Sequence, residues 1–142
     1  PLTYRDERAG EALREAVRRS LAKTRKQCRK VDPAVDEVPA GLPELVDRLR
    51  AAAAAAGSVG SSKAVEVGTA ADDLASLIGA YRRTLLLREA LRLLAVQAHA
   101  ANGNGFTFGR LHAQQERAGR VALRDLRKAG KALRQTPVGW LD

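Results

Sequence analysis

The chain has 142 residues, of which 25 are Lys or Arg and 16 are Asp or Glu, so its formal net charge is +9. A hydrophobic fraction of 45% at this length excludes wholesale disorder and favours one domain with a core of its own. Aromatic residues make up only 4%, and the apolar residues are mainly Ala, Leu and Val, which disfavours a β-rich fold and favours packed helices.

The sequence contains no segment that predicts export or membrane insertion. Its N-terminus lacks the apolar run of a signal peptide, and the most apolar stretch, residues 74–101, is interrupted by five charged residues. The single cysteine, Cys28, excludes an intramolecular disulfide and fits a reducing compartment. We therefore expect a cytoplasmic protein, and the abundance of Ala and of Arg over Lys favours a bacterial source. Because the chain begins at Pro1, it is either trimmed or a piece of a longer protein.

The first predicted helix spans residues 4–30. Its apolar residues, among them Leu13, Val17 and Leu21, share one helical face, and its second half is almost entirely cationic. Three prolines and a glycine then predict a loop over residues 32–42.

The second predicted helix spans residues 43–56 and begins at Pro43, which suits a first helical turn. The Gly- and Ser-rich segment 57–62 predicts a second loop, which we extend over residues 57–68, although residues 63–68 are ambiguous and a further turn of helix is the alternative for them. Thr69, with Asp72 three positions later, has the spacing of an N-terminal cap for a third helix.

The third and fourth predicted helices are long. Residues 69–101 carry leucines around a broad face, so we expect this helix to be the most buried one. Asn-Gly-Asn-Gly at residues 102–105 predicts a tight turn, and residues 106–134 repeat apolar residues at steps of three and four. These elements predict an all-α fold: a four-helix up-down antiparallel bundle with long third and fourth helices, forming one domain over residues 1–142. An alternative is that the last two helices form a hairpin whose core is completed only in a dimer.

The positive charge is concentrated at the two ends of the chain. Residues 1–31 contain ten Lys or Arg and four Asp or Glu, and residues 103–142 contain eight and three. In a ring of four helices the first and last are neighbours, so their outward faces would form one surface that attracts polyanions such as nucleic acid or polyphosphate. The candidate polyanion-binding residues are Arg25, Lys26, Arg29, Lys30, Arg117, Arg120, Arg124, Arg127, Lys128 and Lys131.

No pattern of catalytic residues is present, and no motif indicates a cofactor. Glu116 lies one helical turn after His112, and the predicted turn separates both from His99, so these three are the candidates for a metal site. Two histidines are the background expectation for a chain of this length, and metal-dependent activity is therefore only the second alternative.

The apolar surface of the last two helices favours a non-enzymatic interaction module that binds a protein partner or self-associates through them. The first alternative is polyanion binding by the basic faces of the first and last helices.

Overall fold

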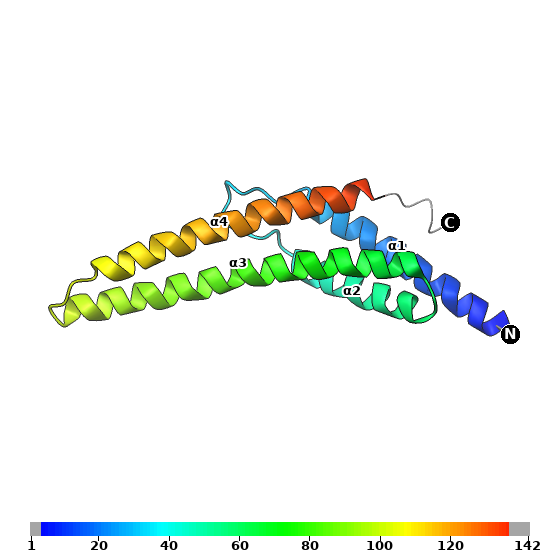
Figure 1. Cartoon of the computed structure of the whole chain (residues 1–142), viewed down its shortest axis with the longest axis horizontal. Helices are drawn as coiled ribbons and strands as arrows, with labels where there is room; N and C mark the ends of the chain where they lie inside the picture. Colours follow the sequence, from blue (N-terminus) through cyan, green and yellow to red (C-terminus); the bar gives the residue numbers. More distant parts are fainter. Residues whose placement is uncertain (1–3, 137–142) are drawn as a thin grey trace.

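The computed structural model describes residues 4–136, which form four α-helices and no β-strand. Successive helices run in opposite directions (Figure 1), as predicted for an up-down bundle. The predicted all-α class and the long third and fourth helices are confirmed. The helices are α1 (Tyr4–Cys28), α2 (Leu42–Ser58), α3 (Ser62–Ala100) and α4 (Phe106–Gln135).

The two shorter helices, α1 and α2, cover only one half of the α3–α4 hairpin. α2 has 17 residues and α3 has 39, and a rise of 1.5 Å per residue gives lengths of about 25 Å and 58 Å. The hairpin therefore projects beyond α1 and α2 (Figure 1). The core lies where the helices overlap, and its largest fully buried side chains are Leu21, Leu42, Leu49, Leu74, Leu123 and Leu126.

The prediction of a loop over residues 57–68 is wrong except at residues 59–61, which separate α2 from α3, and the alternative of a further helical turn over residues 63–68 is confirmed. The Ser61 hydroxyl caps α3 by accepting a hydrogen bond from the amide of Ala64. Ala64 and Val67 are buried in the core. Burial therefore stabilises an early turn of α3 that the local Gly- and Ser-rich composition does not indicate.

The predicted cap at Thr69 is also wrong, because this residue lies inside α3. Its hydroxyl donates a hydrogen bond to the carbonyl of Val65 at 3.1 Å. Asp72 pairs instead with Arg50 of α2, at 2.6 Å. The polar residues that resemble a cap in the sequence thus belong to the α2–α3 contact.

The prediction that the third helix is the most buried is wrong for its second half. Up to Thr84 a residue of α3 is buried at every turn, whereas none is buried from Leu85 to Ala100. On α4 the first buried residue is Gly119. The physical reason is length, since α1 and α2 do not reach this part of the hairpin.

Candidate interaction surfaces

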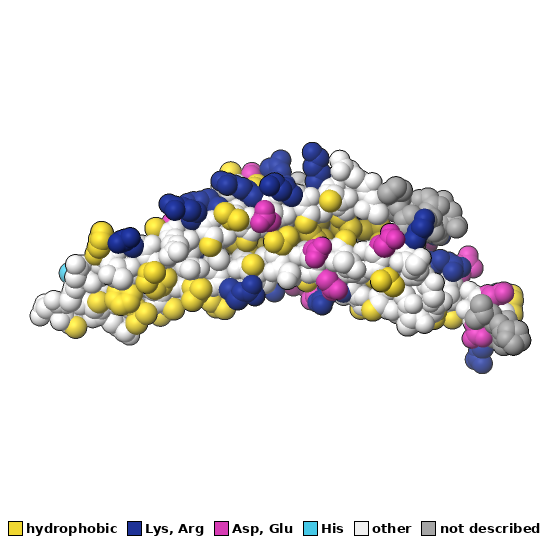
Figure 2. Space-filling view, in the orientation of Figure 1, with side chains coloured by type: hydrophobic (Ala, Val, Ile, Leu, Met, Phe, Trp, Pro, Cys, Tyr) yellow, Lys and Arg dark blue, Asp and Glu magenta, His cyan; other side chains and the backbone are white. Residues whose placement is uncertain are grey.

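The projecting half of the hairpin, which we call the arm, exposes a large apolar surface. Eleven of the sixteen residues from Leu85 to Ala100 are Ala, Leu or Val. Leu86 is 73% exposed, and Phe106 at the start of α4 is 66% exposed. Figure 2 shows apolar side chains gathered over the distal part of α3. The apolar arm face comprises Leu85, Leu86, Leu87, Leu93, Leu94, Val96, Phe106 and Leu111.

The charged side chains on the α3 side of the arm are paired. Arg92 lies 2.7 Å from Glu89, three residues earlier on the same helix. Arg88, at the base of the arm, pairs with Asp36 of the α1–α2 loop. This side of the arm is therefore apolar and close to electrically neutral.

A row of cations follows the outward face of α4, over the half of the hairpin that α1 and α2 cover. Its members are spaced mostly by three or four residues, which places them on one side of the helix. All are exposed, and none forms an ion pair with another residue of the range 4–136. Figure 2 shows dark blue side chains along α4, away from the apolar patch on the arm. The cationic row comprises Arg117, Arg120, Arg124, Arg127, Lys128 and Lys131.

The remaining predicted polyanion-binding residues lie at the end of α1, where one of them has a structural role. Arg25 donates hydrogen bonds to two carbonyls at the C-terminal end of α4, from Nε to Leu133 at 2.9 Å and from Nη2 to Thr136. Helix ends leave such carbonyls without a full set of partners, so Arg25 fastens α1 to α4. The residues that remain exposed are Lys26, Arg29 and Lys30.

A cluster that the sequence analysis missed fastens the α1–α2 loop to α3. The Arg88 side chain, which is 11% exposed, donates to both carboxylate oxygens of Asp36 at 2.5 and 3.3 Å. The Tyr81 hydroxyl donates to the backbone carbonyl of Asp36 at 2.6 Å. The hydrogen bond from Arg88 holds the pKa of the Asp36 carboxyl below its usual range, and burial raises the pKa of Tyr81. Since Asp36 and Arg88 are 52 residues apart, no local pattern marks them as partners.

The predicted metal candidates do not gather into a ligand set. His112 Nδ1 lies 3.8 Å from Glu116 Oε1, and His99 is exposed near the end of α3. In the described part of the chain, no three His, Cys, Asp or Glu side chains are grouped so that they could hold a metal ion. The metal-dependent alternative therefore has no geometry to support it.

Cys28 belongs to the core and lies against Gly130 of α4. Burial raises the pKa of its thiol to about 11, although the positive charge of Arg134 acts in the opposite direction. Because the thiolate is the reactive form, the cations that neighbour Cys28 in the sequence do not make it a nucleophile.

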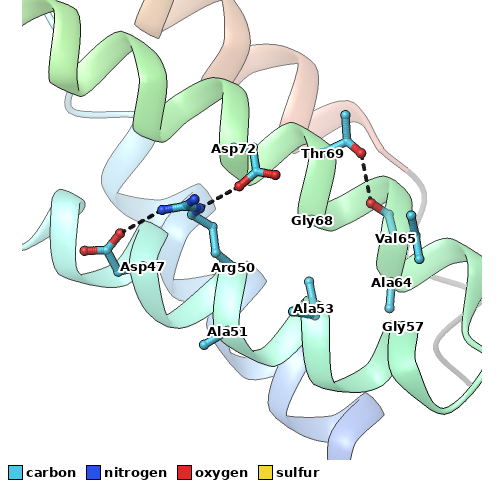
Figure 3. A pocket seen from close by; sticks show the side chains of 11 residues that line it. Asp47, Arg50, Ala51, Ala53, Gly57, Ala64, Val65, Gly68, Thr69 and Asp72 are labelled. Carbon is cyan, nitrogen blue, oxygen red and sulfur yellow. Dashed lines mark hydrogen bonds and ion pairs between the residues drawn. The ribbon is translucent and has the colours of Figure 1, made fainter.

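An open hollow between α2 and α3 is lined by small residues (Figure 3). A Cβ atom on Gly68 would lie 3.4 Å from the Cβ of Ala53, so the two helices pack closely here. Arg50 lies between Asp47 and Asp72, at 3.6 and 2.6 Å. The three charged side chains that line the hollow are thus paired with one another and carry a net charge of −1, and the close approach of small residues fits a packing seam between helices rather than a ligand site.

Comparison of the chain with protein-family models, with curated proteins and with solved structures finds no significant match. Within residues 4–136, no helix combines the length and the apolar character needed to cross a membrane. The function is therefore inferred from the surfaces of the chain itself.

Proposed function

We propose that the chain is a non-enzymatic helical interaction module that associates with a second copy of itself through the apolar arm face. The observation that carries this proposal is the exposure of eight large apolar side chains, each at least 40% exposed, on a part of the hairpin where α3 has no buried residue. A helix that is apolar around most of its circumference is normally buried on several sides, and apolar patches of this kind mark interaction sites.

The charge distribution favours a second copy over a strongly charged partner. Glu89 and Arg92 neutralise each other on the arm, and Arg88 is neutralised by Asp36. The α3 side of the face is thus neutral, and Arg110 on α4, 6.0 Å from the centre of the Phe106 ring, adds one positive charge at its edge. A largely apolar face with so little charge is complementary to another face of the same kind. A twofold arrangement, in which each copy presents the same patch, is the commonest symmetry of soluble oligomers.

The exposed apolar surface is large enough for a stable dimer. Taken together, the eight side chains expose about as much surface as four that are fully exposed. At roughly 1.5–3 kcal/mol for each side chain buried, two copies gain on the order of 10–25 kcal/mol before any losses. Association costs about 4–15 kcal/mol, and the midpoints of the two ranges leave a surplus of roughly 8 kcal/mol, which corresponds to a dissociation constant of about one micromolar.

Light scattering after size-exclusion chromatography, over a concentration series, tests the proposal. The wild-type chain is expected to be a dimer that dissociates on dilution. Leu86→Glu combined with Leu93→Glu places two carboxylates one heptad apart on the exposed side of the arm, and this variant is expected to be monomeric with unchanged helical circular dichroism. The matched control is Val35→Glu combined with Val59→Glu, which changes two exposed valines in connecting segments and leaves the dimer intact.

Two results would overturn the proposal. The first is a wild-type chain that stays monomeric at tens of micromolar, which would leave the arm to a different partner. The second is a dimer that persists in the Leu86→Glu, Leu93→Glu variant, which would place the interface elsewhere.

A further inference from the structure

We propose that the cationic row of α4 is a binding site for a linear phosphate polyanion, a chain of phosphates such as the backbone of a nucleic acid or an inorganic polyphosphate. The row runs from Arg117 to Lys131, a span of 14 residues, or about 21 Å of helix. One strand of duplex DNA advances about 3.4 Å per phosphate, so this length faces about six phosphates. A linear array of charges suits a linear ligand better than a single compact anion.

Three cations that span the row have no carboxylate partner on their own helix or elsewhere in the described fold, whereas Arg120 and Lys128 have Glu116 and Asp125 four and three residues earlier. Arg117, Arg124 and Lys131 have no Asp or Glu three or four residues away on either side, which are the positions that pair on a helix. The other helices supply no carboxylate either, since none of the three forms an ion pair with another described residue. At these three positions, which span the whole length of the row, electrostatic attraction of an anion is therefore not offset by a paired carboxylate.

Some arginines elsewhere in the structure are paired, but others, such as Arg5, Arg14 and Arg48, form no ion pair within residues 4–136, so the row is distinguished by the alignment of its six cations along one helix. Arg50 pairs with two aspartates, and Arg92 pairs with a glutamate on its own helix. Solubility alone is achieved with both signs of charge interspersed. A stripe of one sign, held at the same face over four turns of helix, is the pattern that attracts a polyanion.

The composition of the row indicates contacts with phosphate and not with bases. Four of its six members are arginines, whose planar guanidinium groups can bind phosphate oxygens in pairs. No aromatic residue lies between Arg117 and Lys131, so the row offers no platform on which bases could stack. Contacts with phosphate alone carry no sequence information, and we expect binding to be independent of base sequence.

The row is also presented on a rigid support. Gly130 lies against Cys28 of α1, and Gly119 lies against Thr84 of α3. Because the covered half of the hairpin bears the row and the projecting half bears the apolar arm face, self-association through the arm leaves the row open. This site is therefore independent of the proposed function, and either can fail without the other.

Fluorescence anisotropy with labelled duplex DNA, single-stranded RNA and polyphosphate, each titrated at a series of salt concentrations, tests the proposal. A site that contacts about six phosphates of a duplex loses roughly a thousandfold in affinity between 50 and 200 mM salt. The variant Arg117→Gln, Arg124→Gln, Lys131→Gln removes three of the six contacts along one line of the helix. Its affinity for the duplex is expected to fall only about fortyfold over the same salt range.

The matched control removes the same net charge from exposed residues of α1 and α2, with Arg5→Gln, Arg14→Gln and Arg48→Gln. This control is expected to retain the wild-type salt dependence, and the ranking of the three probes identifies the source of the phosphate chain. Equal loss of binding in the two triple variants would show that only net charge matters and would overturn the proposal. Absence of binding to all three probes at 50 mM salt would overturn it as well.

Discussion

At Gly130, α4 passes so close to α1 that a side chain has no room. A Cβ atom on this residue would lie 2.8 Å from the Cβ of Cys28 and 3.2 Å from its Sγ. The Cys28 Cβ is fixed to the backbone of α1, so Gly130→Ala must push the two helices apart. Overpacking of this kind costs about 1–3 kcal/mol, and the better helix propensity of alanine recovers about 1 kcal/mol. We expect a net loss of roughly 1 kcal/mol, which corresponds to about 2–4 °C in Tm.

Gly109 on the same helix is the matched control, because a Cβ atom there has nothing within 4 Å. Gly109→Ala should therefore stabilise the chain by up to about 1 kcal/mol. Urea unfolding followed by far-ultraviolet circular dichroism measures both variants. If Gly130→Ala proved as stable as Gly109→Ala, the close approach of α1 and α4 would be refuted. Cys28→Gly removes the opposing Cβ, so combining it with Gly130→Ala should cost less than the two changes do separately.

Three further outcomes follow from the polar and thiol contacts. Asp36→Asn removes the charge that Arg88 holds, and because the Asp36 side chain is 49% exposed we expect a loss of about 1 kcal/mol or less at pH 7. Because the pKa of Asp36 is lowered in the folded state, the ionised carboxyl stabilises the fold above its unfolded pKa near 4, and this contribution is lost as the pH falls through the folded value. The difference between the urea midpoints of wild type and variant should therefore shrink as the pH falls below about 4, and a difference that stays constant down to the lowest pH at which both fold would contradict the assignment. Cys28 should react with a disulfide reagent at pH 8 roughly a hundredfold more slowly in the native chain than in denaturant. The reason is that its pKa of about 11 leaves little of the reactive thiolate. Equal rates would show that the thiol is not buried. Arg25→Gln should increase amide hydrogen exchange in the last turn of α4 with little effect on α2, and unchanged exchange would show that the contact to the Leu133 carbonyl does not hold that helix end.

Helical periodicity predicted the existence, order and direction of all four helices, because each core face depends on residues three or four positions apart. The connections were less predictable. Residues 57–68 have the composition of a loop, yet Ala64 and Val67 are helical and buried. Packing against α2 makes that segment helical. Local composition does not report such packing, because the contacting residues belong to a different helix.

The sequence contains evidence that the arm is uncovered, but this evidence lies in the lengths of the helices and not in their periodicity. The pattern shows that residues 85–100 are apolar, and apolar residues are normally assigned to a core. Whether they reach a core depends on how far the neighbouring helices extend, and the predicted second helix is less than half as long as the third. Helix lengths carry this information, and the alternative of a hairpin whose core is completed only in a dimer is the prediction that agrees with the uncovered arm.

The arginines show why a candidate site cannot be taken from charge in the sequence alone. Arg88 and Arg124 are alike locally, since neither has a carboxylate three or four residues away on its own helix. The fold brings Asp36 to Arg88 across 52 residues, whereas it brings no carboxylate into an ion pair with Arg124 within residues 4–136. Arg25 was equally plausible as a phosphate ligand until its guanidinium was found on the carbonyls that end α4. Two conditions thus favour a cation as the ligand of an external anion. Its own helix supplies no carboxylate that pairs with it, and no other element of the fold supplies one. The sequence reports only the first condition.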